Sequence, residues 1–218
     1  MYNLIINLLI IISGICWSVV YVDSIRTGFK QKTYCMPLFA LGLNIAWEGI
    51  YAFMDLFVRN NIGAQAIANT AWFLLDIFIV VSFLKFGKEE MEGEVSKKYF
   101  VAWTILVLIC CFALQLLFIY EFGVIEGEKY SAYLQNITMS VAYLYMLNRR
   151  KSSKGQTMTI AVCKCIGTVT PTIFGTLEGN MFILVTGIIC FIFDVIYICS
   201  LHHVIQKEKA AEIATARA

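Results

Sequence analysis

The sequence predicts an all-α integral membrane protein built as a bundle of seven transmembrane helices. Of the 218 residues, 60% are hydrophobic, 15% are charged and only 2 are proline. The mean hydropathy of +0.75 lies far above that of a soluble domain. The charged residues fall in short clusters between long apolar runs. These clusters are therefore loops, and a formal net charge of +2 gives no reason to expect nucleic acid as a partner.

Each apolar run is long enough to cross a bilayer, because a hydrocarbon core of roughly 30 Å needs about 20 helical residues. The first run lacks the basic leader and the small-residue cleavage site of a signal peptide, so it counts as a helix. The stretches that separate the helices are, in order, DSIRTGFKQKTYC, FVRNNIGA, KFGKEEMEGEVSKK, EFGVIEGEK, NRRKSSKGQT and EGN. They are too short to hide a second domain. The predicted helices are 4–22, 36–56, 65–84, 99–120, 130–147, 158–177 and 181–202, followed by a short polar tail, 203–218.

Lysine and arginine counts orient the bundle, because cytoplasmic loops are enriched in both. Fourteen of these residues lie in the tail and in the loops after the first, third and fifth helices, whereas the opposite side carries Arg59 and Lys129. This predicts an N-terminus outside and a C-terminus in the cytoplasm. Protease access to the 121–129 loop from the cytoplasmic side would overturn that orientation. The membrane would be the plasma membrane in a bacterium or the endoplasmic reticulum in a fungus, since no targeting motif decides between them.

The cysteines predict no metal or disulfide framework. Most of the 8 cysteines sit inside apolar helices, and none forms a C-x-x-C pair. Cys163 and Cys165 in CKC point to different helix faces and have no histidine nearby to complete a metal site. His202 and His203 lie at the end of the last helix, where interaction with the helix C-terminus explains them.

Three acidic residues lie near the middle of predicted helices, where a charge is costly and usually functional. They are Glu48, Asp76 and Asp194, which become the candidate catalytic residues. Lys164 lies about two turns into its helix and could equally snorkel to the cytoplasmic face. A structural role near a helix end explains the other charged residues within or beside the helices, namely Asp55, Lys85 and Glu178.

Helical spacing places polar and aromatic residues beside these acids, because neighbours on a helix fall at i+3, i+4 and i+7. We expect the acid-bearing faces to converge on one cavity. Aromatic stripes in membrane helices more often pack or face lipid, but here the rings lie next to the acids. The candidate substrate-binding residues are Asn44, Trp47, Tyr51, Asn69, Trp72, Gln135, Asn136, Lys164 and Tyr197, with Ser140 on the same face as Asn136.

This combination of residues favours acid-initiated chemistry. A carboxylic acid in an apolar cavity can stay protonated at neutral pH and donate its proton. Indole and phenol faces attract cations, most strongly where water is excluded. An acid, a second carboxylate and aromatic walls are what a cation-driven cyclisation of a polyene would require.

Five motifs occur in an order that resembles a known family: NIAWE, WFLLD, LQN followed by MS, KGQT, and an aspartate midway along the last helix. The chain is similar over nearly its whole length to the small seven-helix membrane terpene cyclases of meroterpenoid and indole-diterpene biosynthesis. NIAWE is the most specific of the five. One position departs from the family pattern: an arginine is expected in the sixth helix, where this chain has Lys164.

The resemblance implies that Glu48 and Asp194 are catalytic. It implies protonation of the terminal epoxide of a prenylated, lipid-like substrate, followed by ring closure and loss of a proton. Neither a metal ion nor another cofactor is implied, and the expected partners are that substrate and membrane lipids.

A transporter is the alternative from another functional class. FLLDIFIV and FIFDVIYI share F-x-x-D in the third and seventh helices, as a three-plus-one-plus-three repeat would. Asp76, Asp194 and Glu48 would then titrate or bind substrate in a proton-coupled or sugar transporter. A retinal photoreceptor is disfavoured, because the last helix has no lysine for a Schiff base.

Overall fold

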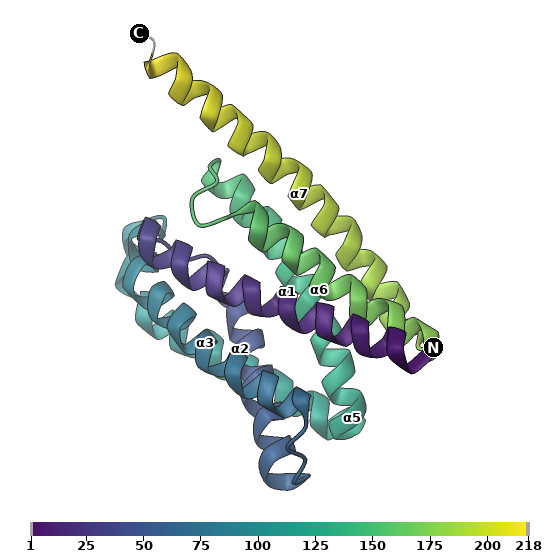
Figure 1. Ribbon diagram of the computed structural model, residues 1–218. Coiled ribbons are helices and arrows are strands. Elements are labelled where there is room, and N and C mark those ends of the chain that lie inside the picture. The colour runs from purple at the N-terminus through teal and green to yellow at the C-terminus, as the bar shows by residue number, and fades with distance from the viewer. Residues whose placement is uncertain (1, 217–218) are drawn as a thin grey trace.

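The computed structural model describes the backbone of residues 2–216 and the side chains of residues 4–216. Every regular element in this range is helical, so the predicted all-α class is confirmed (Figure 1). Six of the helices are long and apolar enough to cross a membrane. The elements are α1 (Tyr2–Gln31), α2 (Leu38–Phe53), the π-helical turn η1 (Met54–Val58), α3 (Ala64–Phe86), the 3-10 turn η2 (Gly87–Glu90), α4 (Glu94–Lys98), α5 (Phe100–Arg150), α6 (Met158–Leu177) and α7 (Met181–Ala216).

Helix α5 is a hairpin of two arms, 100–122 and 124–150. The chain reverses at Gly123, whose φ of 73° and ψ of 172° are not helical. Gln115 in the first arm donates to Gln135 in the second over 3.1 Å. Twenty residues of straight helix would separate these two side chains by about 30 Å. The two arms correspond to the separately predicted fourth and fifth helices, so six long helices supply the seven predicted segments.

Glycine is required where the two arms of α5 meet. A Cβ atom on Gly127 would lie 2.7 Å from the carbonyl oxygen of Phe118, which is closer than a real Cβ contact. At the reversal itself, the positive φ of Gly123 is one that residues with side chains rarely adopt. The motif EFGVIEGEK therefore encodes a tight helical hairpin.

Helices α1 and α7 extend furthest beyond their predicted ends. Helix α1 continues to Gln31, about nine residues beyond the predicted end. Helix α7 continues to Ala216 and takes in most of the predicted tail, of which residues 217–218 lie outside the described part of the chain. Both extensions are polar, and the predicted helices were bounded by their apolar runs. The predictions therefore end near the expected membrane boundary and not at the ends of the helices. The run KEKAA has strong helix formers, which explains why the helix continues into water.

The bundle buries several charged side chains within an apolar core, and it exposes many large apolar side chains. Helix α1 packs on α3 and α6, α2 on α3 and α5, and α7 on α5 and α6 (Figure 1). Large apolar side chains such as Leu74 and Ile109 are more than half exposed, whereas Glu48, Asp76, Lys164 and Asp194 are almost completely buried. Charged side chains inside and apolar side chains outside suit a bundle surrounded by lipid.

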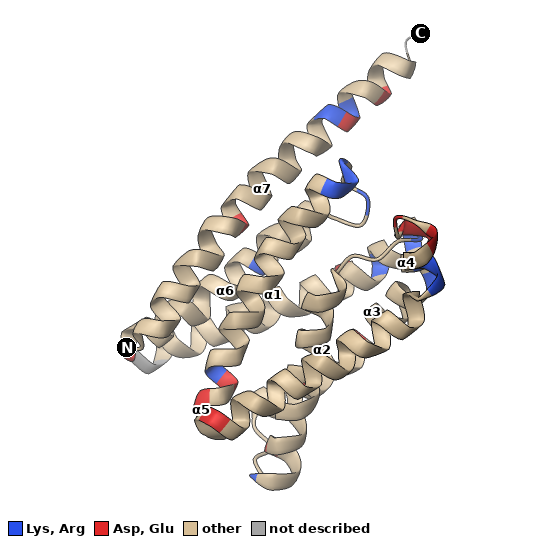
Figure 2. Cartoon of the chain, turned by 180° about the vertical axis from the view of Figure 1, so that it is seen from behind, with Lys and Arg blue, Asp and Glu red and all other residues tan. Residues whose placement is uncertain are grey.

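Basic residues gather at one end of the bundle, around α4, the α5–α6 loop and the end of α7 (Figure 2). Few lie at the opposite end, where η1 and the turn of α5 are found. The distribution is the one from which the orientation was predicted, and the orientation itself stays a prediction.

The loops at the basic end are firmly packed. Arg150 pairs with Glu90 at 2.7 Å and donates to the carbonyl oxygen of Tyr34 over 3.0 Å. Burial raises the pKa of the Cys35 thiol to about 12. In the KGQT motif, Thr157 caps α6 by accepting from the backbone N–H of Ile160 at 3.1 Å. These contacts fix the helix ends at the basic side of the bundle, in the helices that carry the candidate site.

Candidate active site

One buried polar cluster joins α1, α2 and α3. The Tyr21 hydroxyl donates to Glu48 Oε1, and the Asn44 amide nitrogen lies 3.1 Å from the same oxygen. Asn44 also donates to Asp76 Oδ2 over 2.9 Å and to the Tyr21 hydroxyl. All four side chains are at most 3% exposed. We call Tyr21, Asn44, Glu48 and Asp76 the acid cluster.

Two amides connect the acid cluster to both arms of α5. Gln135 lies at hydrogen-bond distance from Asn44, with 3.5 Å between its Nε2 and Asn44 Oδ1. Gln115 donates to Gln135 and, over 3.3 Å, to the carbonyl oxygen of Leu43. The predicted binding residues Asn44 and Gln135 are thus part of one network. This network fixes the Asn44 side chain, which contacts the carboxyl groups of both Glu48 and Asp76.

The acid cluster has free acceptor atoms and no cation. Glu48 Oε2 and Asp76 Oδ1 are buried and have no hydrogen-bond partner. Among the described side chains, no lysine, arginine or histidine forms an ion pair with either carboxyl group. Two carboxyl groups held by one amide in an apolar interior do not both carry a charge, because nothing offsets their repulsion and desolvation. The arrangement therefore retains a proton.

Two tryptophan rings pack next to Tyr21 of the acid cluster. The ring of Tyr21 stacks on Trp72 with 6.0 Å between centroids and 7° between planes. Trp17 approaches the other side of Tyr21 at 6.4 Å. The Trp72 indole N–H donates to Ser18 over 3.1 Å, which fixes the ring between the two helices. Trp72, predicted to bind substrate, lies one ring away from Glu48.

A second buried cluster joins α5, α6 and α7. Lys164 Nζ lies 2.7 Å and 3.0 Å from the two carboxylate oxygens of Asp194. It also donates to Ser140 over 2.7 Å, and Ser140 in turn donates to the backbone oxygen of Asn136. Lys164 is 0% exposed, so the expectation that it could snorkel to the surface is wrong. We call Ser140, Lys164 and Asp194 the ion-pair cluster.

The acids predicted to share one cavity are divided between these two clusters. Tyr143, on the second arm of α5, is completely buried. Its ring lies 5.5 Å from that of Tyr197, whose hydroxyl donates to Gln156 of the KGQT motif over 3.0 Å. Helical spacing predicts which residues share a helix face, but it does not tell which faces meet.

Three predicted binding residues lie toward the non-basic end of the bundle. Trp47 is half-buried and donates to the backbone oxygen of Glu128 over 3.0 Å. Its ring lies 5.2 Å from that of Tyr51, which is buried with an unpaired hydroxyl. Asn69 is buried and accepts a hydrogen bond from Gln65 over 2.7 Å. None of these three hydrogen-bonds to a candidate catalytic acid.

Sequence reasoning missed Tyr21 and Gln115. Both lie in apolar helices that carry no acid near their middle, which is the feature on which the predicted site residues rest. A usable signal was present: Trp17 and Tyr21 repeat the i, i+4 spacing of polar aromatic residues, and Gln115 is an isolated amide in CCFALQLLF.

Residues 1–207 match the Pyr4-like transmembrane terpene cyclases as a family. The chain belongs to this family. It is 30% identical over 166 residues to the Pyr4-family terpene cyclase mfmH of Annulohypoxylon moriforme, a match covering 74% of this chain and 66% of that protein. It is 26% identical over 212 residues to the terpene cyclase pyr4 of Aspergillus fumigatus, covering 91% and 86%. Asnovolin H synthase nvfL of Aspergillus novofumigatus is 29% identical over 168 residues, covering 75% and 66%. No solved structure matches the chain.

Membership of the Pyr4-like family confirms the resemblance drawn from the five motifs and makes this chain a multi-pass membrane protein of a terpene cyclase family. The transporter alternative rested on equivalent F-x-x-D aspartates in α3 and α7. Their surroundings are not equivalent, because Asp76 is held by an amide and Asp194 by an ammonium group. The Pyr4-like family and the geometry both favour the cyclase.

Proposed function

We propose that this chain cyclises a prenylated substrate inside the membrane by protonating its terminal epoxide, with Glu48 as the proton donor. The observation that carries the proposal is the asymmetry of the Glu48 carboxyl group. Oε1 is held by Tyr21 and Asn44, while Oε2 is buried and free. A carboxyl group fixed at one oxygen presents its other oxygen in a defined direction, and that oxygen can carry the proton.

The proposed reaction leaves atoms and charge balanced. The Glu48 proton moves to the epoxide oxygen, the C–O bond to the more substituted carbon breaks, and the oxygen becomes a hydroxyl group. Each alkene then uses its π pair to form a C–C bond to the cationic carbon, until a C–H bond loses its proton to a base. The product is an isomer of the substrate, and the carboxyl group of Glu48 regains a proton.

The aromatic rings and the ion pair have separate proposed roles. Trp72 and Tyr21 offer π faces beside the acid, where a cation would be stabilised. Asp194 is held as a carboxylate by Lys164, so it is assigned to charge stabilisation or acceptance of the final proton. Asp76 is assigned a positioning role, because it accepts from the Asn44 amide that contacts Glu48 Oε1. In a fungal host, we assign the protein to the endoplasmic reticulum.

The test uses purified protein in lipid nanodiscs and a panel of prenylated aromatic epoxides of different chain lengths. The expected product has unchanged mass and a new retention time. Glu48→Gln keeps the side-chain size but removes the transferable proton, so turnover should fall by at least ~10²-fold. The matched control is Glu178→Gln at the exposed end of α6, which should keep its activity.

Normal turnover by Glu48→Gln would remove Glu48 from the proposed role. If the whole panel gives no isomer, and proteoliposomes show proton-coupled uptake that Glu48→Gln abolishes, the transporter replaces the cyclase.

A further inference from the structure

An open groove of about 890 Å³ runs between α1 and α3. Its walls are mostly apolar, and small residues such as Gly14, Ala68 and Ala71 leave it wide. A Cβ atom added to Gly14 would meet nothing within 4 Å, so the space beside this residue is empty. The volume lies in the range of small-molecule sites, and the groove opens beside lipid-facing positions such as Ile67, which is 60% exposed.

The groove reaches the acid cluster through one side chain. Trp72 lines the groove, and Ser18, which accepts its indole N–H, lines it as well. The Trp72 ring also stacks on Tyr21, whose hydroxyl donates to Glu48. A molecule lying in the groove therefore contacts Trp72, which is linked through Tyr21 to the proton donor of the proposed reaction.

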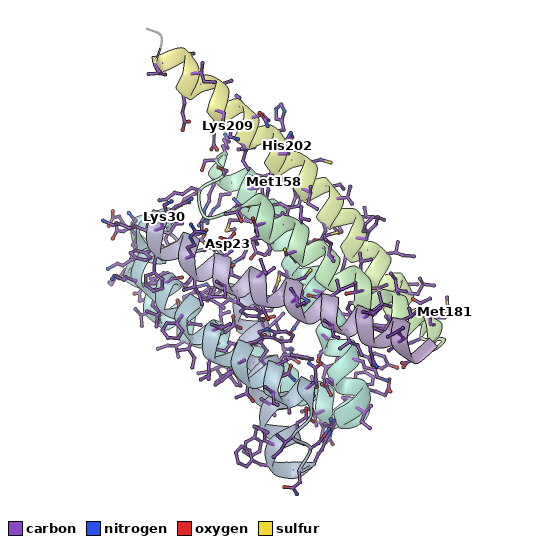
Figure 3. All side chains as sticks on the ribbon, viewed as in Figure 1. Asp23, Lys30, Met158, Met181, His202 and Lys209 are labelled. Carbon is purple, nitrogen blue, oxygen red and sulfur yellow. The ribbon has the colours of Figure 1, made fainter. Side chains whose placement is uncertain are left out.

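The groove is amphipathic along its length. Ile11, near one end, and Arg26, near the other, are fifteen residues apart on α1, which is about 22 Å of helix. Asp23, Arg26 and Thr159 form the polar end, at the basic side of the bundle. Asp23 accepts a hydrogen bond from Thr157 over 2.5 Å, and Figure 3 shows it on α1 beside the start of α6 at Met158. Lipid-facing residues line the remainder.

We propose that this groove is the binding site for the linear isoprenoid chain of the substrate, entered sideways from the bilayer. The chain lies along α1 and α3 and across Trp72, with a neutral polar head group at Asp23 and Arg26. This inference rests on the proposed function, because it names the site from which the acid cluster takes its substrate.

Charge favours this occupant over an anionic phospholipid. The polar end combines one carboxylate with one guanidinium group, so it is close to neutral overall. A phosphodiester would be attracted by Arg26 but repelled by Asp23, whereas a phenol or similar hydroxyl-bearing ring can donate to Asp23 and accept from Arg26. A single isoprenoid chain also suits this groove, because one aromatic side chain, Trp72, lines it.

The experiment is photo-crosslinking in nanodiscs with a farnesylated phenol that carries a diazirine on its prenyl chain, followed by peptide mapping. We expect label on α1 and α3 within the groove. Ala71→Leu fills the groove from α3 and Gly14→Leu from α1, and each should lower this label at least about tenfold, since each blocks the place of several methylene groups. The matched control is Ala113→Leu, in a shallow lipid-facing depression on the first arm of α5, which should leave the label unchanged.

Label spread evenly over all lipid-facing helices would overturn the inference. So would equal labelling of the groove by a diazirine phospholipid, since the groove would then be a lipid site. Crosslinking and cyclisation are read separately. A protein that labels in the groove but cyclises nothing contradicts the proposed function alone, while one that cyclises but labels elsewhere contradicts only the groove.

Discussion

The acid cluster and the ion-pair cluster place similar residues in opposite electrostatic states. Both are buried, and each contains an aspartate from an F-x-x-D sequence near the middle of a helix. Asp76 shares an amide donor with Glu48 and pairs with no described cation, while Asp194 is bound through both oxygens by Lys164. Whether a buried carboxyl group is protonated or ionised therefore depends more on its hydrogen-bond or ion-pair partner than on its depth.

Removing the cation from the ion-pair cluster should have the largest effect. Lys164→Met would leave the Asp194 carboxylate buried without a partner, which typically costs about 3–5 kcal/mol. We expect a clear fall in the unfolding temperature measured in detergent. Glu48→Gln in the acid cluster removes no ion pair, so its unfolding temperature should stay near that of the wild type. Equal stability losses in the two variants would end the distinction between the clusters.

The double variant Lys164→Met/Asp194→Asn separates stability from catalysis. It removes both charges, so most of the stability lost in Lys164→Met should return. If Asp194 stabilises the substrate cation or accepts the final proton, cyclisation by this stable double variant should stay about 10²-fold below wild type. That loss corresponds to a rise of about 2.7 kcal/mol in the activation free energy. Recovery of full turnover would reduce the ion pair to a structural role.

The sequence predicted the fold well because a bilayer imposes one dominant pattern. Runs of apolar residues gave seven segments, and α6 begins and ends within a residue of its prediction. The polar extensions of α1 and α7 were missed, since hydropathy marks the membrane boundary and not the end of the helix. The buried acids were found because charge at mid-bilayer depth is rare.

The pairing of site residues could not be predicted in the same way. Helical spacing fixes which residues share a face, but the Tyr21–Glu48 and Lys164–Asp194 contacts join helices far apart in the sequence. Lys164 shows the consequence. Its distance from the helix start allowed either snorkelling or burial, and only the position of α7 decides between them.

Tyr21→Phe should have a smaller effect than loss of either acid. The variant removes the hydroxyl that orients Glu48 Oε1 but keeps the ring that stacks on Trp72. One hydrogen bond to an uncharged group contributes about 0.5–1.5 kcal/mol, so kcat should fall up to about tenfold. KM and the unfolding temperature should hold, because the Phe ring keeps the stacking contact with Trp72 and the π face that Tyr21 offers to the cation.

The matched control for this change is Tyr34→Phe. Its hydroxyl is also hydrogen-bonded, to Arg149 over 2.5 Å, but it lies at the basic end of the bundle. This variant should keep kcat. A fall in the unfolding temperature of Tyr21→Phe that matches its loss of kcat would indicate a structural role only.

Asp76→Asn should have the smallest effect and gives the sharpest comparison, because Asp194→Asn is the same substitution in the other F-x-x-D sequence. At position 76 the new amide can still accept from Asn44 through its oxygen, so the network that holds Glu48 survives. No cation loses its partner. We expect cyclisation to fall only a few-fold, within the range of one neutral hydrogen bond, and the unfolding temperature to change little.

Asp194→Asn instead leaves the Lys164 ammonium group uncompensated, so both activity and stability should drop. Initial rates and thermal unfolding of the two variants in parallel nanodisc preparations make the comparison. An inactive but stable Asp76→Asn would show that the transferable proton resides on Asp76, and Glu48 would then be the residue that holds it in place.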